Sequence, residues 1–229
     1  MIFFTKEMSS VFIAEIVNKV LSPLGIKIAR TKTKNFPRIV FPVEASERDL
    51  EILNTVLRFD EPDKALSMTS MERVWAVIQA TKYIVHNNIE GDFVECGVWR
   101  GGCALAMAMV LSDLKSDKKI YLFDTFEGMT MPTEIDKTRY GTHALDYHVP
   151  NEKGGLNSHR WAYASLEDVK EQFINNSVQS AAVFIKGDVL KTLKSPENIP
   201  KKISLLRLDT DWYESTKLEM DILFPKIEK

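Results

Sequence analysis

The sequence predicts an α/β domain with a doubly wound, mostly parallel sheet and a helical appendage at the N-terminus. From residue 92 onward, short apolar segments alternate with segments of helical periodicity. This alternation is typical of a parallel sheet that is covered by helices on both faces. The length of 229 residues and the hydrophobic content of 45% are enough for one packed domain with a small appendage.

Four strands and three helices are expected in the alternating part of the chain. The strands are expected at 92–98, 119–126, 181–189 and 202–210, and the helices at 102–114, 165–175 and 213–224. A polar segment at 127–160 contains His and Gly and is long for a connection between elements. It is therefore predicted to be a lid or a substrate loop.

The N-terminal part is expected at residues 1–66, ahead of the main domain at 67–229. It begins with an amphipathic helix at 8–21, which Ser22-Pro23 ends. A basic linker follows at 27–38, and a solvated linker explains it better than a nucleic-acid patch because aromatic residues are few. The N-terminal helices are plausible elements of a homo-oligomer.

Two further helices precede the first strand. The helix at 46–57 is capped by Ser46, and Asp49 stands at the spacing of a capping box. The next helix is capped by Thr69 or Ser70. Its apolar face has helical spacing and comprises Met71, Val74, Trp75, Ile78 and Val85.

Composition excludes several classes of protein. The net charge of −2 does not indicate nucleic acid or anionic lipid as a partner. The two cysteines, Cys96 and Cys103, lack the spacing of a zinc site and are expected to be free thiols in a reducing compartment. No apolar run approaches the roughly 18 residues of a membrane span. A cytoplasmic protein without a membrane span is therefore expected.

The first strand ends in a glycine-rich turn, VECGVWRGG. Ligands of open α/β sheets bind beyond the carboxyl ends of the strands, so Gly97 and Gly101 could let a ligand approach the backbone. The spacing is not that of a dinucleotide fingerprint. Tight packing of strand on helix explains the glycines equally well. Glu95, just before the turn, could hold an ammonium group.

The next two strands end in aspartates. Asp124 could accept hydrogen bonds from a ribose diol, and Asp188 could accept one from an exocyclic amine. Either could also be an ordinary turn aspartate. Together with the glycine turn, the acidic strand ends predict a nucleoside with an amino-acid tail, which is S-adenosylmethionine.

The fourth strand ends in LLRLDTDWYEST, with Asp209 and Asp211 one residue apart. Like charges this close repel, so each carboxylate needs a counter-charge or a raised pKa. A Mg²⁺ ion held by one aspartate, with the other as general base, explains the pair. A metal-dependent glycosyltransferase built on Asp209-Thr210-Asp211 is the alternative enzyme, and an acidic cap at a strand-to-helix turn is the simplest alternative.

Three stretches resemble the macrocin O-methyltransferase family of sugar methyltransferases. They are MTSMERVWAVIQATKYIVHNNIEGDFVECGVWRGG, YLFDTFEGM and LLRLDTDWYEST. The resemblance implies a class I methyltransferase, Rossmann-like fold with S-adenosylmethionine as cofactor. It also implies metal-assisted methylation of a sugar hydroxyl on a small-molecule or glycan acceptor, in natural-product or polysaccharide biosynthesis.

The resemblance also assigns residues by their position. It implies that Asp209 is a Mg²⁺ ligand and Asp211 the general base. Ser165, the expected cap of the helix at 165–175, is included among the cofactor-binding residues. The remaining cofactor-binding residues implied are Glu95, Gly97 and Gly101 at the amino-acid part, Asp124 at the ribose, Asp188 near the adenine, and Thr69, Ser70 and Met71 over the methionine.

The sequence departs from the family pattern at its end. In the family, a further strand ends in adjacent aspartates that complete the metal site, whereas this sequence ends at Lys229. A domain that lacks its last strands is therefore expected, with an incomplete Mg²⁺ site. The strand at 202–210 is expected to be an exposed edge. A catalytically inactive fragment that still binds the cofactor is the non-enzymatic alternative.

Overall fold

The computed structural model describes residues 41–138, 140–146 and 162–228. The helix predicted at 8–21 and the linker at 27–38 lie outside these ranges. Val43–Lys229 forms one compact unit, which includes the helix α2 (Glu47–Leu57). The division between residues 66 and 67 stays a prediction.

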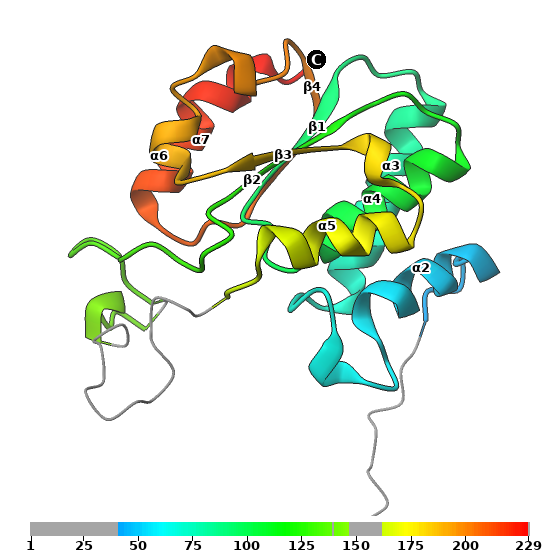
Figure 1. Cartoon of the computed structure of the whole chain (residues 1–229), viewed down its shortest axis with the longest axis horizontal. Helices are drawn as coiled ribbons and strands as arrows, with labels where there is room; N and C mark the ends of the chain where they lie inside the picture. Colours follow the sequence, from blue (N-terminus) through cyan, green and yellow to red (C-terminus); the bar gives the residue numbers. More distant parts are fainter. Residues whose placement is uncertain (1–40, 139, 147–161, 229) are drawn as a thin grey trace, which may run out of the picture. The chain divides into compact units, whose positions relative to one another are not determined.

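Four parallel strands form the sheet, as predicted. They are β1 (Asp92–Cys96), β2 (Ile120–Asp124), β3 (Ala182–Lys186) and β4 (Ile203–Leu208). Their order is β3-β2-β1-β4, so β1 lies in the interior and pairs with both β2 and β4 (Figure 1). The sequence prediction is confirmed for the α/β class and for each of these strands.

Helices cover both faces of the sheet. One face carries α3 (Met71–His86), α4 (Gly102–Asp113) and α5 (Leu166–Asn175), and the other carries α6 (Val189–Thr192) and α7 (Tyr213–Leu223) (Figure 1). Short 3-10 turns occur at Pro62–Lys64, Ala144–Asp146, Gln179–Ala181, Pro196–Asn198 and Phe224–Lys226. Among the described residues, no helix is long and apolar enough to cross a membrane.

Alternation along the strands divides the core into two layers. Phe93 packs into the layer that contains α3 and α4, whereas its neighbour Val94 packs into the layer beside α7. Successive side chains of a strand point to opposite faces, so one apolar strand supplies both layers. The helix α4 is buried from Gly102 to Leu111 because it lies between the sheet and the helices α2 and α3. An apolar sequence all round is typical of a helix in that position.

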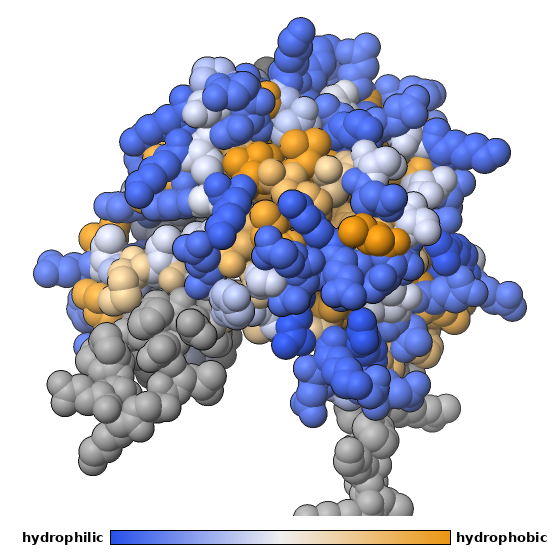
Figure 2. Space-filling view, in the orientation of Figure 1, coloured by the Kyte–Doolittle hydropathy of each residue, from blue (hydrophilic) through white to orange (hydrophobic). Residues whose placement is uncertain are grey.

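The strand β4 lies at one border of the described sheet. Besides β1, β4 pairs with the end of the described chain through a single parallel bridge. In this bridge Ile203 pairs with Ile227, and the Glu228 N–H donates to the Ile203 carbonyl at 2.8 Å. Side chains from Ser204 to Leu208 are half-buried. Apolar side chains also gather in the middle of the view in Figure 2, where Figure 1 draws the strands.

The helix α2 is joined to α3 through Asp49. The predicted capping box is present, because Ser46 Oγ accepts from the Asp49 N–H at 3.2 Å and Asp49 Oδ2 accepts from the Ser46 N–H at 3.1 Å. Lys82 Nζ of α3 donates to both carboxylate oxygens of Asp49, at 2.6 and 2.7 Å. Asp49 is only 1% exposed, so this ion pair is shielded from water. Ser70 stands at the cap position of α3, but its side chain makes no cap hydrogen bond.

We expect Asp49→Ala to lower the free energy of unfolding by about 1–3 kcal/mol, because it removes the cap and leaves Lys82 without its partner. Urea unfolding followed by circular dichroism measures the change. The control is Glu51→Ala in the same helix, whose exposed carboxylate pairs with Arg48 at the surface. An equal loss in both variants would contradict the importance assigned to the buried pair.

Candidate active site

A cavity of about 360 Å³ lies beyond the carboxyl ends of all four strands. This volume is within the range of small-ligand pockets. Each strand contributes to it through the turn that follows the strand. The contributing residues are Gly97 and Trp99 after β1, Asp124 and Thr125 at the end of β2, Gly187 and Asp188 after β3, and Asp209, Thr210 and Asp211 after β4.

Gly97 makes the closest backbone approach in the site. Its φ is +82°, and a Cβ added there would lie 2.2 Å from the carbonyl oxygen of Asp209. The Asp209 N–H donates to the Cys96 carbonyl at 2.8 Å, so the ends of β1 and β4 are held together next to this contact. A side chain at Gly97 is excluded by space as well as by conformation.

Asp124 fixes the turn after β1. One carboxylate oxygen accepts from the N–H groups of Val98 and Trp99, at 2.7 and 3.0 Å. The other accepts from the Phe126 N–H at 2.7 Å. Thr125 Oγ1 also lies 3.5 Å from this second oxygen, at the limit of a hydrogen bond. A carboxylate has about four lone-pair positions, so a ligand hydroxyl could donate to Asp124 in place of Thr125. The role predicted at a ribose therefore stays a prediction.

Two backbone donors at the start of α4 have partners in the chain. The Gly102 N–H donates to the Leu66 carbonyl at 3.0 Å, and the Gly101 N–H donates to the Val98 carbonyl at 2.9 Å. Gly101 is buried and is not part of the cavity lining, and a Cβ added there would lie 2.9 Å from Val169. Tight packing, one of the two explanations left open by the sequence, accounts for the glycines here.

Glu95 lies behind the cavity in an ion-pair chain. It is 1% exposed, and its Oε1 accepts from Arg207 Nη1 at 2.6 Å. Arg207 Nη2 donates to Asp209 Oδ2 at 2.7 Å. Burial raises the pKa of Glu95 to about 7, against the opposing attraction of Arg207. The carboxylate predicted to hold an ammonium group thus has a guanidinium as its partner.

The other predicted cofactor residues divide into two groups. Thr69 and Asp188 line the cavity, and Asp188 also caps α6 by accepting from the Leu190 N–H at 2.9 Å. Ser70, Met71 and Ser165 are not part of the lining. Met71 packs against the core, and Ser165 caps α5, as expected, by accepting from the Asp168 N–H at 3.1 Å.

Asp211 occupies a strained turn at the end of β4. Its φ is +66°, and the Trp212 N–H donates to the Thr210 carbonyl at 2.8 Å across it. Although the Asp211 side chain reaches solvent, the surrounding walls partly desolvate its carboxylate and raise its pKa, and the charge of Asp209 adds to this effect. Asp209 and Asp211 both line the cavity, and the roles predicted for them stay predictions.

The described residues do not form a metal centre by themselves. Across 41–138, 140–146 and 162–228, no three His, Cys, Asp or Glu side chains come together as possible ligands. The carboxylate of Asp209 already has a positive neighbour in Arg207. The Mg²⁺ role of Asp209 therefore stays a prediction.

Three polar residues of the site were missed at the level of sequence. Arg207 interrupts the apolar run LLRLD, and a charge inside a strand is a signal for a buried partner. Glu219 follows Ser215 by four residues on α7 and precedes Leu223 by four, and all three are buried. That spacing marks one face of a helix. Asp136 lies in the polar loop after β2, where no sequence pattern distinguished it.

Comparison with known proteins identifies the family of this chain. The sequence profile of the family described as macrocin-O-methyltransferase (TylF) matches residues 43–229. The chain belongs to this family.

Relatives with curated names support the same assignment. The chain is 30% identical over 172 residues to the demethyldecarbamoylnovobiocin O-methyltransferase of Streptomyces niveus. It is 29% identical over 171 residues to the 8-demethyl-8-(2,3-dimethoxy-alpha-L-rhamnosyl)-tetracenomycin-C 4'-O-methyltransferase of Streptomyces olivaceus. Each match covers 73% of this chain and 60% of the relative, so the chain spans about 60% of the length of these proteins.

A solved structure shares the fold. The O-methyltransferase NovP superposes with a TM-score of 0.62 at 24% identity, over 78% of each chain. This similarity confirms the class I, Rossmann-like arrangement expected for the macrocin O-methyltransferase family.

We expect Gly97→Ala to lower the free energy of unfolding by at least about 2 kcal/mol, because it adds a steric clash with the Asp209 backbone to the cost of a positive φ. Gly141→Ala is the matched control. Gly141 has a φ of +84°, but an added Cβ there meets nothing within 4 Å. Only the conformational cost of about 1 kcal/mol should appear in the control. Equal losses in the two variants, measured by chemical denaturation, would show that the close approach is not a constraint.

Glu219 gives the stability of the unit a pH dependence. It is fully buried, its Oε2 accepts from Thr210 Oγ1 at 3.1 Å, and its Oε1 has no hydrogen-bond partner among the described residues. Burial raises the pKa of Glu219 to about 7 from 4.5, although the Thr210 hydroxyl opposes the shift. The folded state therefore binds this proton more tightly than the unfolded state does. Stability contributed by the bound proton is lost as the pH rises from about 4.5 through 7.

The free energy of unfolding should fall between pH 5 and pH 8, and we expect this fall to be roughly 2–3 kcal/mol smaller in Glu219→Gln. Glu95 titrates in the same direction and remains in the variant. The control is Asp221→Asn, an exposed change on the same helix. The measurement is urea unfolding at a series of pH values. A Glu219→Gln profile parallel to that of the unchanged chain would disprove the assignment.

Proposed function

We propose that this protein is an S-adenosylmethionine-dependent O-methyltransferase that methylates a sugar-type hydroxyl of a small-molecule or glycan acceptor. Membership of the macrocin O-methyltransferase family and the names of the relatives support the reaction class. The observation that carries the proposal within this chain is the chemistry of the cavity at the strand ends.

The cavity has an excess of acidic side chains. Arg73 is the basic residue of its lining, and the acids are Asp124, Asp136, Asp188, Asp209, Asp211 and Glu214. A cavity with this balance attracts a cationic ligand and repels an anionic one. S-adenosylmethionine fits this requirement, since its sulfonium and ammonium groups outweigh its one carboxylate, and when bound it would supply the methyl group for transfer.

The chain's own residues would bind and orient this cofactor. Asp124 and Asp188 offer carboxylate oxygens to hydroxyl and amine donors, and the backbone at Gly97 forms part of the cavity wall. Thr69 contributes to the wall at the start of α3. These assignments agree with the roles predicted from the family resemblance.

Asp211 is suited to take the proton of the acceptor hydroxyl. Of the aspartates that line the cavity, it is the one whose carboxylate accepts no hydrogen bond from a described residue, whereas Asp124, Asp136, Asp188 and Asp209 all have donors. Its lone pairs are therefore available, and its raised pKa makes it a better base than an ordinary aspartate. The bound cofactor would supply the methyl group and leave as S-adenosylhomocysteine, and Asp211 would take the proton that the acceptor hydroxyl loses.

The glycosyltransferase alternative is less well supported. A nucleoside diphosphate is an anion and would enter an acid-lined cavity, and the described residues provide no metal centre to offset its charge. A divalent cation at Asp209 remains a prediction, and the proposed proton transfer does not depend on it. A cytoplasmic location and a homo-oligomer also remain predictions.

We expect the chain to bind S-adenosylhomocysteine in the micromolar range without added metal, measured by titration calorimetry. Asp211→Asn should keep this affinity, because the residue is assigned to the acceptor, and should lower methyl transfer to an α-L-rhamnoside by about 100-fold or more. Asp117→Asn, an exposed change ahead of β2 at the amino-terminal end of the sheet, is the control. A folded chain that binds no S-adenosylhomocysteine would overturn the proposed function. Full transfer by Asp211→Asn would overturn the role of the base.

A further inference from the structure

The turn that carries Asp211 needs support from its surroundings. A positive φ at a non-glycine residue costs on the order of 1 kcal/mol or more, and a turn closed by a bond between residues two apart is strained when its central φ is positive. Asp211 has both features, with a φ of +66° and the bond from the Trp212 N–H to the Thr210 carbonyl. Without neighbouring contacts, the backbone would relax and the Asp211 carboxylate would lose its orientation.

Asp136 supplies such a contact from a distant part of the chain. Its Oδ1 accepts from the Tyr213 N–H at 2.8 Å, two residues after Asp211. Its Oδ2 accepts from the Thr133 N–H at 2.7 Å and from Thr133 Oγ1 at 2.9 Å. Asp136 is 5% exposed, so these bonds are shielded from water. Burial alone would raise the pKa of Asp136, but the bonds from Tyr213 and Thr133 outweigh it, and the pKa is lowered.

Asp136 therefore acts as the cap of α7. Trp212, which precedes the helix, makes no side-chain cap hydrogen bond. A carboxylate at the first amides of a helix satisfies a free donor and interacts favourably with the helix dipole. In this protein the carboxylate comes from the loop after β2 instead of from the residues next to the helix.

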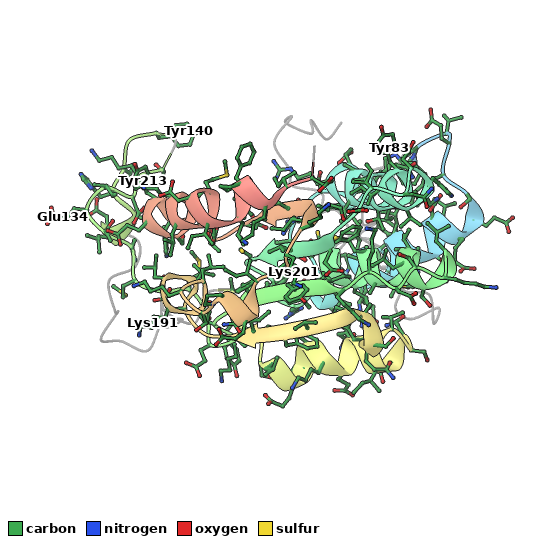
Figure 3. All side chains as sticks on the ribbon, turned by 90° about the horizontal axis from the view of Figure 1, so that it is seen from above. Tyr83, Glu134, Tyr140, Lys191, Lys201 and Tyr213 are labelled. Carbon is green, nitrogen blue, oxygen red and sulfur yellow. The ribbon has the colours of Figure 1, made fainter. Side chains whose placement is uncertain are left out.

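A second contact joins the same two segments. Trp212 Nε1 donates to the Thr130 carbonyl at 3.0 Å. The loop is braced internally, since the Ala144 N–H donates to the Asp136 carbonyl at 2.9 Å. Figure 3 shows this loop, marked by Glu134 and Tyr140, beside the start of α7, marked by Tyr213. Both segments line the cavity, the loop through Met129, Thr130, Met131 and Thr133, and the end of β4 through Asp209, Thr210, Asp211 and Trp212.

We propose that Asp136 is a positioning residue for methyl transfer: its carboxylate holds the strained turn at Asp211 and so fixes the orientation of the proposed base toward the acceptor. This inference rests on the proposed function. The clasp formed by Asp136, Thr133 and Tyr213 connects the cavity wall after β2 with the cavity wall after β4. Its effect should fall on the chemical step more than on cofactor binding, because Asp124 and Asp188 do not depend on it.

The test compares Asp136→Ala and Asp136→Asn with the unchanged chain. We expect Asp136→Ala to speed hydrogen exchange of the Tyr213 amide about tenfold or more and to lower kcat for methyl transfer to an α-L-rhamnoside by about 10- to 100-fold. The affinity for S-adenosylhomocysteine should stay within about twofold. Asp136→Asn should restore part of both losses, because its side-chain oxygen can still accept from the Tyr213 N–H, whereas its amide nitrogen cannot accept from the Thr133 N–H.

The matched control is Glu134→Ala. This residue lies in the same loop, but its side chain is exposed and points away from the cavity (Figure 3). It should behave as the unchanged chain in all three measurements. If Asp136→Ala does not fold, Trp212→Phe removes the bond to the Thr130 carbonyl and should speed Tyr213 exchange and lower kcat in the same direction.

The outcomes distinguish the positioning role from the proposed function. Unchanged Tyr213 exchange in Asp136→Ala, or faster exchange with an unchanged kcat, would overturn the positioning role. A fall in kcat that merely follows a fall in S-adenosylhomocysteine affinity and melting temperature would also overturn it. An unchanged chain that binds S-adenosylhomocysteine but methylates no acceptor would contradict the proposed function. Hydrogen exchange of the Tyr213 amide would still decide whether Asp136 orders the turn.

Discussion

The arrangement of the site depends on the contact between the turn after β1 and the end of β4. Gly97 lies so close to the Asp209 carbonyl that no side chain fits between them. Ladder bonds continue across the strand ends, from the Gly97 N–H to the Phe123 carbonyl and from the Gly187 N–H to the Asp124 carbonyl, both at 2.9 Å. Since the strands are parallel, their carboxyl ends meet at one edge, and these bonds align the polar residue that follows each strand. The cavity is a consequence of this alignment.

Arg207 balances the charge that the alignment concentrates. Its register partner on β1 is Glu95, and its neighbour two residues on is Asp209, so one guanidinium contacts both carboxylates on the same face of the sheet. Although burial alone would lower the pKa of Arg207, the attraction of Glu95 and Asp209 raises it. A buried ion pair is weak support for stability, because desolvation offsets much of the attraction. Its structural effect here is to fix the Asp209 carboxylate at the rim of the cavity.

The fold could be predicted because it depends on local signals. Apolar runs such as KIYLFDTF and helical spacing such as Val74 to Ile78 are properties of neighbouring residues. Ser46 and Ser165 likewise cap their helices through hydrogen bonds to residues three positions further along the chain. For the site, the sequence predicted which strand ends would come together, but not the partners of the side chains there. The pairings of Glu95 with Arg207 and of Asp136 with Tyr213 join residues 112 and 77 positions apart. Such contacts depend on strand register and on the path of a polar loop, and neither can be read from one sequence.

The different surroundings of the cavity aspartates explain how acids of one type can serve different purposes. Backbone N–H groups donate to the carboxylates of Asp124 and Asp136, and those hydrogen bonds fix the turn after β1 and the start of α7. Asp211 has no such donors within the described chain, and its partial desolvation favours the protonated form. A carboxylate that is held by its backbone and not by hydrogen bonds to its own oxygens keeps its lone pairs free for a substrate proton. The strain of the turn at Asp211 is thus the structural cost of an available base, and it falls on the backbone because the side chain must remain uncommitted.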